Sequence, residues 1–142
     1  MTVSYRASAD GLTADQLRGG FFVGWPSGPA PEDHLRILRA ATAVELALDE
    51  AGAVIGFLTA ISDGVSCVYL PLLEVLPAHH GRGIGTALVR RMLDRFRHVY
   101  MVDLSCDPAV QPFYARLGLR PTIGMALRNY ARQACSPTRL PA

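Results

Sequence analysis

The sequence predicts an α+β fold, in which helices interrupt and flank a mixed, mostly antiparallel sheet. Three observations favour this class: short apolar runs are separated by turn signals, amphipathic helical patterns lie between them, and no repeat, low-complexity tract or linker divides the 142 residues. A chain of this length can form one domain with a substantial core and is too short for two. We therefore expect a single domain over residues 1–130 and a flexible tail over residues 131–142.

The first third of the chain predicts one strand and two helices. Residues 2–8 alternate enough to form a first strand. Thr13 and Gln16 resemble a capping box, which favours a short helix over residues 13–18. Pro31, followed by two acidic residues, favours the start of a second helix.

The middle of the chain predicts a three-stranded meander. Two apolar runs at residues 43–48 and 53–61 are separated by residues 49–52, which carry a hairpin signal. After a second turn, residues 65–76 form the third strand. Pro71 lies inside this strand and cannot donate a ladder hydrogen bond, so it indicates an edge or a bulge.

The last third predicts a strand, a short helix and a final strand. A buried strand covers residues 99–104, and a short helix covers residues 111–117. Pro112 suits the first helical position, and Gly118 suits the left-handed position after the last turn. Residues 123–127 give the final strand.

Composition limits the function classes. Half of the residues are hydrophobic and 18% are charged, which is typical of a globular protein, and the net charge of +2 does not argue for nucleic acid. The three cysteines are an odd number without the spacing of metal ligands, so we expect no metal and a reduced, cytoplasmic setting. No signal peptide is visible and no apolar run approaches a membrane span, so we expect no membrane association.

A glycine-rich turn joins a strand to an amphipathic helix within residues 73–96. The strand is apolar except for Glu74, the turn contains Gly81, Gly83 and Gly85, and apolar residues then recur at helical spacing. Amides at a helix N-terminus carry partial positive charge, and glycines let the backbone approach a phosphate closely. The pattern therefore predicts an anion site, with a ligand-free strand–helix turn as the alternative.

Two familiar phosphate loops do not fit this turn. The three glycines are each two residues apart, unlike the dinucleotide fingerprint, and the chain has no lysine, which a P-loop requires. The sequence His80-Gly81-Arg82-Gly83-Ile84-Gly85 instead resembles the Gln/Arg-x-x-Gly-x-Gly/Ala pyrophosphate loop of the GNAT superfamily of acetyl-CoA-dependent N-acetyltransferases. His80 stands where that family usually has Gln or Arg. The order of predicted elements is also similar to the GNAT fold over nearly the whole chain.

The resemblance implies an acyl-CoA N-acyltransferase fold with splayed central strands and acetyl-CoA (coenzyme A) as cofactor. Asp107 stands where the family commonly has an Asn that touches the cofactor, and it has a turn cap as its alternative role. A main-chain N–H of the strand before the turn is expected to polarise the thioester carbonyl, at Val75 or Leu76. The residues implied in cofactor binding are Leu73, Val75, Leu76, His80, Gly81, Arg82, Gly83, Gly85, Thr86 and Asp107.

Two residues are candidates for proton transfer. Tyr114 lies in a segment similar to the family's second motif, where a Tyr serves as general acid, and its alternative role is packing. Glu74 is a lone carboxylate in an apolar strand, which makes it our candidate for the general base. Its alternative is a structural carboxylate bonded to Arg or to the backbone.

The acceptor pocket is expected in the least family-like segment, with Trp25, Phe22 and His34 as candidate substrate-binding residues, although Phe22 equally suits the core. We predict an N-acetyltransferase that moves the acetyl group of acetyl-CoA to a primary amine by direct attack. An acetyl-enzyme on Cys106 is less favoured, because no base lies beside it in the sequence.

The acceptor is a small-molecule amine or a protein amino group, which the sequence does not distinguish. The main alternative function is a non-catalytic acyl-CoA-binding sensor or partner module. A nucleic-acid binder is poorly supported, because the arginines are scattered. Family analogy also suggests a homodimer, through sheet edges or the C-terminal strand.

Overall fold

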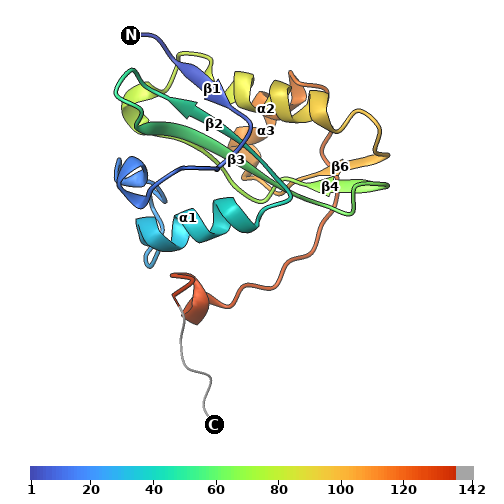
Figure 1. The fold of residues 1–142 in the computed structure, drawn as a ribbon. Coiled ribbons are helices and arrows are strands. Elements are labelled where there is room, and N and C mark those ends of the chain that lie inside the picture. Colours follow the sequence, from blue (N-terminus) through green and yellow to red (C-terminus); the bar gives the residue numbers. More distant parts are fainter. Residues whose placement is uncertain (137–142) are drawn as a thin grey trace.

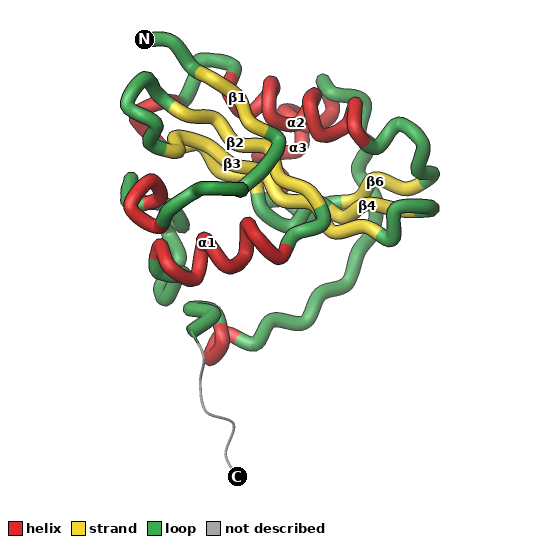
Figure 2. The backbone as a smooth tube through the Cα atoms, in the orientation of Figure 1, coloured by secondary structure: helices red, strands yellow, loops and turns green. Residues whose placement is uncertain are grey.

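The computed structural model describes residues 1–136, in which one sheet lies between helices (Figures 1 and 2). The strands are β1 (Ser4–Arg6), β2 (Ala43–Leu48), β3 (Val54–Ser62), β4 (Cys67–Tyr69), β5 (Leu73–Val75) and β6 (Met101–Asp103). Their order is β1-β2-β3-β4-β6, with β5 paired to β3, and only the β4–β6 pair is parallel. The predicted α+β class with a mostly antiparallel sheet is confirmed.

The helices cover both faces of the sheet. They are α1 (Pro31–Ala40), α2 (Ile84–Arg95) and α3 (Gln111–Ala115), with 3-10 turns η1 (Ala14–Leu17), η2 (Pro77–His79), η3 (Pro108–Val110) and η4 (Tyr130–Arg132). Figure 1 shows α1 on one side of the sheet and α2 with α3 on the other. None of the helices in residues 1–136 combines the length and the apolar character that a bilayer span requires.

The N-terminal predictions are confirmed. Gln16 Oε1 accepts a hydrogen bond from the Thr13 N–H at 3.0 Å, and η1 follows as a 3-10 turn. Helix α1 begins at Pro31. The hairpin is fixed by Asp49, whose carboxylate accepts the N–H groups of Ala51 and Ala53 at 2.9 Å each.

Helix α2 packs closely on the sheet. Its residues Leu88, Val89 and Met92 are fully buried, and burial of each stabilises the fold by about 2 kcal/mol. The helix can approach because β3 has Gly56 beneath it: a Cβ there would lie 3.3 Å from side-chain atoms of Ile84 and Leu88. The face with α2 is therefore rigidly packed against the centre of the sheet.

The predicted third strand over residues 65–76 is two strands, β4 and β5, and they separate at Pro71. Strand β4 pairs with β6, and the Leu70 N–H still donates to Asp103 O at 2.9 Å. After Pro71 the chain turns back to β3, where the Thr59 N–H donates to Leu72 O at 3.0 Å. Strand β5 consequently diverges from β6, which produces the splay that the resemblance implied.

Two strand predictions near the C-terminus need correction. The strand predicted to be buried over residues 99–104 is the shorter β6, and it lies at the sheet edge with Met101 41% exposed. The strand predicted at residues 123–127 has no partner among residues 1–136, and these residues are extended and exposed. An apolar alternating pattern favours a strand, but a strand forms only where another strand supplies its hydrogen bonds.

The chain continues from this extended stretch to α1. Gln133 Oε1 accepts the Ser27 N–H at 3.1 Å, and Arg36 Nη2 donates to Cys135 O at 2.6 Å. Residues 131–136 of the predicted tail are therefore held against α1. The rest of that tail, residues 137–142, lies outside the described residues.

Candidate active site

The glycine turn adopts a conformation that requires glycine at two positions. Gly81 and Gly83 have φ of +74° and +77°, in the left-handed region, and Gly83 is the N-cap of α2. A Cβ at either position would meet nothing within 4 Å, so backbone conformation rather than space excludes other residues. The turn therefore presents backbone N–H groups at the positive end of a 12-residue helix.

His80 fastens this turn to β5. Its Nε2 lies 2.6 Å from Val75 O, and because a carbonyl oxygen only accepts, the ring donates from Nε2. The side chain that replaces the family's usual Gln or Arg thus binds the protein's own backbone. Arg82 Nη1 lies 2.9 Å from His79 Nδ1 in the same turn.

Strand β5 leaves one backbone edge open beside the turn. Phe57 and Glu74 are register partners in the β3–β5 pair, and the Leu76 N–H donates to Ile55 O at 2.9 Å. Residues in an antiparallel pair alternate in the direction of their hydrogen bonds, so Val75 directs its N–H away from β3. Of the two predicted carbonyl-polarising donors, Leu76 is already engaged and Val75 faces the splay.

Tyr114 is positioned by its neighbour Phe113. A Cβ at Gly85 would lie 3.5 Å from Phe113 Cζ, so Phe113 packs on the first turn of α2. The rings of Phe113 and Tyr114 meet edge to face with centroids 4.9 Å apart. Burial, with a smaller contribution from Cys106, raises the pKa of Tyr114 to about 12. The phenol is therefore protonated at neutral pH.

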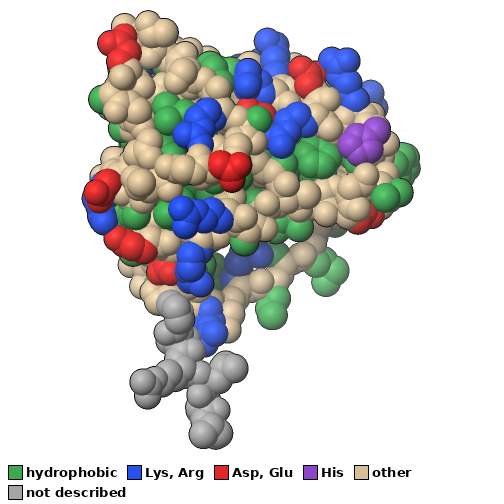
Figure 3. Space-filling model, in the orientation of Figure 1, with side chains coloured by type: hydrophobic (Ala, Val, Ile, Leu, Met, Phe, Trp, Pro, Cys, Tyr) green, Lys and Arg blue, Asp and Glu red, His purple; other side chains and the backbone are tan. Residues whose placement is uncertain are grey.

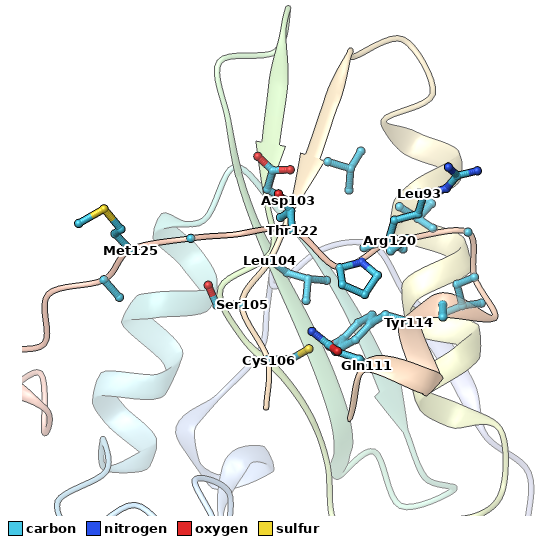
Figure 4. A pocket seen from close by; sticks show the side chains of 18 of the residues that line it. Leu93, Asp103, Leu104, Ser105, Cys106, Gln111, Tyr114, Arg120, Thr122 and Met125 are labelled. Atoms are coloured by element: carbon cyan, nitrogen blue, oxygen red, sulfur yellow. The ribbon is translucent and has the colours of Figure 1, made fainter. Parts of the chain in front are cut away.

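Tyr114 also lines a hollow of about 610 Å³ that borders β6, α3 and the chain after α3 (Figure 4). Gln111 and Cys106 lie on the same side of the hollow as Tyr114, whereas Thr122 lies beside Asp103. None of the lining residues belongs to residues 73–86, so the glycine turn and this hollow are separate features that meet at α3. They are joined through Phe113.

Glu74 lies on the opposite face of β5 from Val75. Its two carboxylate oxygens accept the N–H groups of Phe22 at 2.8 Å and Val23 at 3.2 Å. Phe22 has a φ of +64°, which is uncommon for an aromatic residue. Glu74 therefore stabilises the loop that carries the aromatic residues, which matches the backbone-bonded alternative from the sequence.

The three residues predicted to bind the acceptor substrate lie together, with His34 on α1 and the other two in the loop before it. Phe22 is 6% exposed and His34 is 1% exposed, and both contact Phe57, whereas Trp25 is 41% exposed. Burial lowers the pKa of His34 to about 4. Its Nε2 has no hydrogen-bond partner within residues 1–136. Only Trp25 of this cluster is available to a ligand in this conformation.

The sequence prediction missed one buried carboxylate. Glu45 in β2 is 1% exposed and binds Arg91 Nε at 2.8 Å and Arg95 Nη1 at 3.1 Å. The available signal was the one that drew attention to Glu74, a single carboxylate in an apolar strand.

Asp107 is exposed and precedes η3 without a side-chain cap. Figure 3 shows basic and acidic side chains interspersed on the visible face.

Potential metal ligands and cysteines are the remaining chemistry-bearing side chains. Within the part of the chain that the structure describes, no three His, Cys, Asp or Glu residues are grouped so that they could hold a metal ion. Cys67, Cys106 and Cys135 are unpaired.

Comparison with known proteins identifies the family. A family model described as the acetyltransferase (GNAT) family matches residues 13–119. A crystal structure of a Deinococcus radiodurans R1 protein assigned as an acetyltransferase is 46% identical, with a TM-score of 0.92 over 96% of this chain and 94% of that chain. A GNAT-family protein from Streptococcus pneumoniae is 25% identical, with a TM-score of 0.72 over 90% of this chain and 98% of that chain.

More distant structures share the fold. Glucosamine-6-phosphate N-acetyltransferase from Arabidopsis thaliana is 16% identical, with a TM-score of 0.67 over 90% of this chain and 99% of that chain. A search of curated proteins finds no match. Because the family match spans more than half of the chain, residues 13–119, the protein belongs to the GNAT family of acetyltransferases.

Proposed function

We propose that this acetyltransferase moves the acetyl group of acetyl-CoA to a primary amine by direct attack of the amine. The observation that carries the proposal is the glycine turn, which presents backbone N–H groups at the start of α2 beside the open edge of β5. Such a turn suits a pyrophosphate, and an open strand edge suits the amide-bearing arm of coenzyme A. The family membership supports the same donor.

In this proposal the backbone binds most of the cofactor. The N–H groups from Gly81 to Thr86 bind the pyrophosphate, and Arg82 adds positive charge nearby. Leu73 and Val75 pair with the pantetheine arm through their main chain. His80 acts by holding the turn against Val75 O, since its Nε2 is already committed to that carbonyl. Asp107 is an exposed hydrogen-bond acceptor at the edge of the proposed cofactor site.

The Val75 N–H polarises the thioester carbonyl. Of the two predicted donors it is the one that faces the splay, because Leu76 donates to Ile55 O. A fixed main-chain donor stabilises the negative charge that develops on the carbonyl oxygen and needs no reorganisation during the reaction. No side chain contributes to this step.

Tyr114 stabilises the departing thiolate by hydrogen bonding. With a pKa of about 12, the phenol stays protonated through the neutral and mildly alkaline range. A thiol has a pKa of about 8.5, so complete proton transfer from Tyr114 is uphill by roughly 3–4 pKa units, or about 5 kcal/mol. Donation of a hydrogen bond without complete transfer therefore fits this environment better than a full general-acid role.

Glu74 is the proposed acceptor of the amine proton. An alkylammonium has a pKa of about 10 and must lose a proton before it attacks. A carboxylate has about four lone-pair sites, and the N–H groups of Phe22 and Val23 use two of them. The same bonds place Glu74 beside the loop that carries Trp25, where we propose that the acceptor binds. The buried residues Phe22 and His34 support this loop from the core side.

The proposal is tested by measuring free-thiol release from acetyl-CoA across a panel of small primary amines and of peptides with a free amino group. We expect turnover with at least one amine class and a drop of about 10²-fold in kcat for Tyr114→Phe. Tyr5→Phe is the matched control, because that ring lies on β1 and contacts Arg91, and it should keep full activity. Unchanged kcat in Tyr114→Phe would remove Tyr114 from the mechanism.

A second candidate function is a non-catalytic acyl-CoA-binding sensor. It is favoured by the occupation of both Glu74 oxygens by backbone N–H groups and by the departures from the family pattern at His80 and Asp107. Calorimetry with coenzyme A distinguishes the two. Heat of binding together with no thiol release for any amine would favour the sensor, whereas no heat at all would contradict both functions.

A further inference from the structure

The loop before α1, residues 21–30, presents an apolar surface beside the Glu74 carboxylate. The loop contains no charged residue, and two of its large side chains, Val23 and Trp25, are 60% and 41% exposed. Glu74 is partly exposed and accepts the N–H groups of Phe22 and Val23. The carboxylate and the two exposed apolar side chains therefore lie at the same place on the surface.

Trp25 is held in a defined position by this loop. Its N–H donates to Phe22 O at 3.1 Å, which closes a turn in which Gly24 has a φ of +80°. The buried Phe22 ring lies against the Trp25 ring, with centroids 5.1 Å apart. Gly28 returns the chain closely against Phe22, since a Cβ at Gly28 would lie 2.7 Å from Phe22 Cβ. A ligand that stacks on Trp25 therefore meets an ordered surface, which lowers the entropy cost of binding.

A contact with the C-terminal part of the described chain fixes the end of the loop. The Ser27 N–H donates to Gln133 Oε1 at 3.1 Å. Gln133 follows η4, and Figure 1 shows this turn below α1. The loop that carries Trp25 is thus held by Glu74 at its beginning and by Gln133 near its end.

The acidic residues at the start of α1 are already paired with arginines. Glu32 Oε1 lies 2.7 Å from Arg18 Nη2, and Asp33 Oδ1 lies 2.6 Å from Arg36 Nη2. Glu74 differs from both, because its hydrogen-bond partners among residues 1–136 are backbone N–H groups. An ammonium group at this loop therefore finds one carboxylate whose charge is not already neutralised by a cation.

This combination of one carboxylate and an apolar surface favours an amine with one charge. A polyamine or an amino sugar carries further ammonium groups, which would lie over Val23 and Trp25 and lose hydration without a compensating bond. An amine with one ammonium group and an apolar group meets both parts of the surface. Its charge lies at Glu74, and its apolar group leaves water against the Trp25 ring.

We propose that the acceptor is a small primary amine with one positive charge and an aromatic ring, or an apolar group of similar size, a few bonds from the nitrogen. The inference rests on the acetyl transfer proposed above and names the substrate class of that reaction. Trp25 is then the residue that determines specificity, because its ring contacts the part of the substrate that does not react.

The transfer to such an amine balances in atoms and charge. The ammonium group gives one proton to Glu74, and the lone pair of the neutral nitrogen forms the C–N bond to the thioester carbonyl carbon. The C–S bond breaks with its electron pair on sulfur, where Tyr114 is proposed to donate a hydrogen bond. The nitrogen loses its second proton to solvent and the thiolate takes one up, which gives the N-acetyl amide and the free thiol. Glu74 then releases its proton to solvent.

The single tryptophan of the chain gives a direct measure of this contact. Titration of 2-phenylethylamine into the protein with excess coenzyme A, which carries no acetyl group, should shift the Trp25 fluorescence to shorter wavelength as the ligand's ring excludes water. Ethanolamine lacks the ring, and spermidine carries several ammonium groups. Each should displace 2-phenylethylamine only at concentrations about tenfold higher or more.

Thiol-release kinetics with acetyl-CoA are the second measurement. The kcat/KM for 2-phenylethylamine should exceed that for ethanolamine and for spermidine by about tenfold or more. Trp25→Ala should raise the KM for 2-phenylethylamine about tenfold with little change in kcat, and so remove most of this preference. Trp25→Phe keeps an aromatic ring and should keep the preference. The control Tyr100→Ala removes a ring that is 90% exposed just before β6, and it should leave the preference unchanged.

Failure of the inference and failure of the proposed function give different results. Turnover with an equal or greater kcat/KM for ethanolamine or spermidine overturns the substrate class and leaves acetyl transfer standing. Wild-type preference in Trp25→Ala does the same. A selective fluorescence shift with no thiol release from any amine supports recognition of this amine class and contradicts acetyl transfer. Absence of a selective shift overturns the inference whether or not thiol is released.

Discussion

Residues 73–96 and the C-terminal segment (residues 119–129) both contain an apolar, strand-like stretch, but within residues 1–136 only the first stretch pairs with another strand. Strand β5 pairs with β3, the glycine turn is fastened by His80, and α2 is buried against the sheet. The C-terminal segment has the same alternation and remains extended and exposed.

The difference lies in where the hydrogen-bond partners come from. A helix satisfies its backbone within four residues, and β5 has β3 as a neighbour across the meander. The segment follows α3, and the sheet edge it could join at β6 is separated from it by the hollow. The first region therefore combines local helical bonding with a strand neighbour, whereas the second has no strand neighbour among residues 1–136.

The largest expected effect concerns the ion pairs that tie α2 to the sheet. The double variant Arg91→Met/Arg95→Met leaves Glu45 buried without a cation and should lower the free energy of unfolding by about 3–5 kcal/mol. Denaturant unfolding measures this. The control Arg97→Met breaks an exposed pair with Asp94, with side chains 78% and 64% exposed, and should cost less than about 1 kcal/mol. Equal losses would show that the burial of Glu45 has no energetic role.

Acid should destabilise the body of the molecule through His34. Its pKa is about 4 in the folded protein, below the value of about 6.5 expected when unfolded, so the unfolded state binds more protons between these values. The stabilisation is complete above about pH 6.5 and is lost as pH falls toward 4, by up to about 3 kcal/mol.

Unfolding of the wild type and of His34→Phe, followed from about pH 7.5 to about pH 4, isolates this contribution from other titrating groups. The difference in free energy of unfolding between the two proteins should change steadily over that range. His98→Phe replaces an exposed histidine, and its free energy of unfolding should follow that of the wild type over the same pH range. A pH-independent difference for His34→Phe would contradict the prediction.

The glycine turn should show a smaller but position-specific effect. Gly83→Ala forces a side chain into the left-handed region, at a cost of about 1–2 kcal/mol, or roughly a tenfold rise in the Kd for coenzyme A if the turn changes shape to relieve it. Gly85→Ala lies inside α2, where the added Cβ meets Phe113 at an ordinary 3.5 Å, and should change Kd less than about threefold. Calorimetry that ranks the two variants in the opposite order would exclude the turn as the binding site.

The smallest effect is expected in the C-terminal segment. Met125→Ser removes a fully exposed side chain and should change the free energy of unfolding by less than about 0.5 kcal/mol. Leu88→Ala, in α2, removes a fully buried side chain and should cost about 2–5 kcal/mol. Thermal unfolding of both variants at one concentration makes the comparison, and a large loss in Met125→Ser would contradict the exposed position of this segment.

Several features of the candidate site could be predicted from sequence, and others could not. The left-handed glycines of the turn, and the start of α3 at Gln111 with Pro112 in its first turn, follow from local backbone preferences. The sequence left Val75 and Leu76 equivalent as donors, and only the register against β3 distinguishes them. The contacts of Glu74 with residues 22 and 23 were also beyond prediction, because they join parts of the chain about fifty residues apart.

By itself the sequence determined the class of fold, the start of a helix at Pro31 and the glycine turn that faces the proposed cofactor, because these depend on interactions within a few residues. Only the structure showed that the helix after this turn already begins before Gly85. The tertiary structure decided which strands pair and which carboxylates are buried, and it left the apolar stretch of residues 123–127 in solvent. Strand pairing and burial depend on surfaces brought together from distant parts of the chain, and an alternating pattern carries no information about which surface that is.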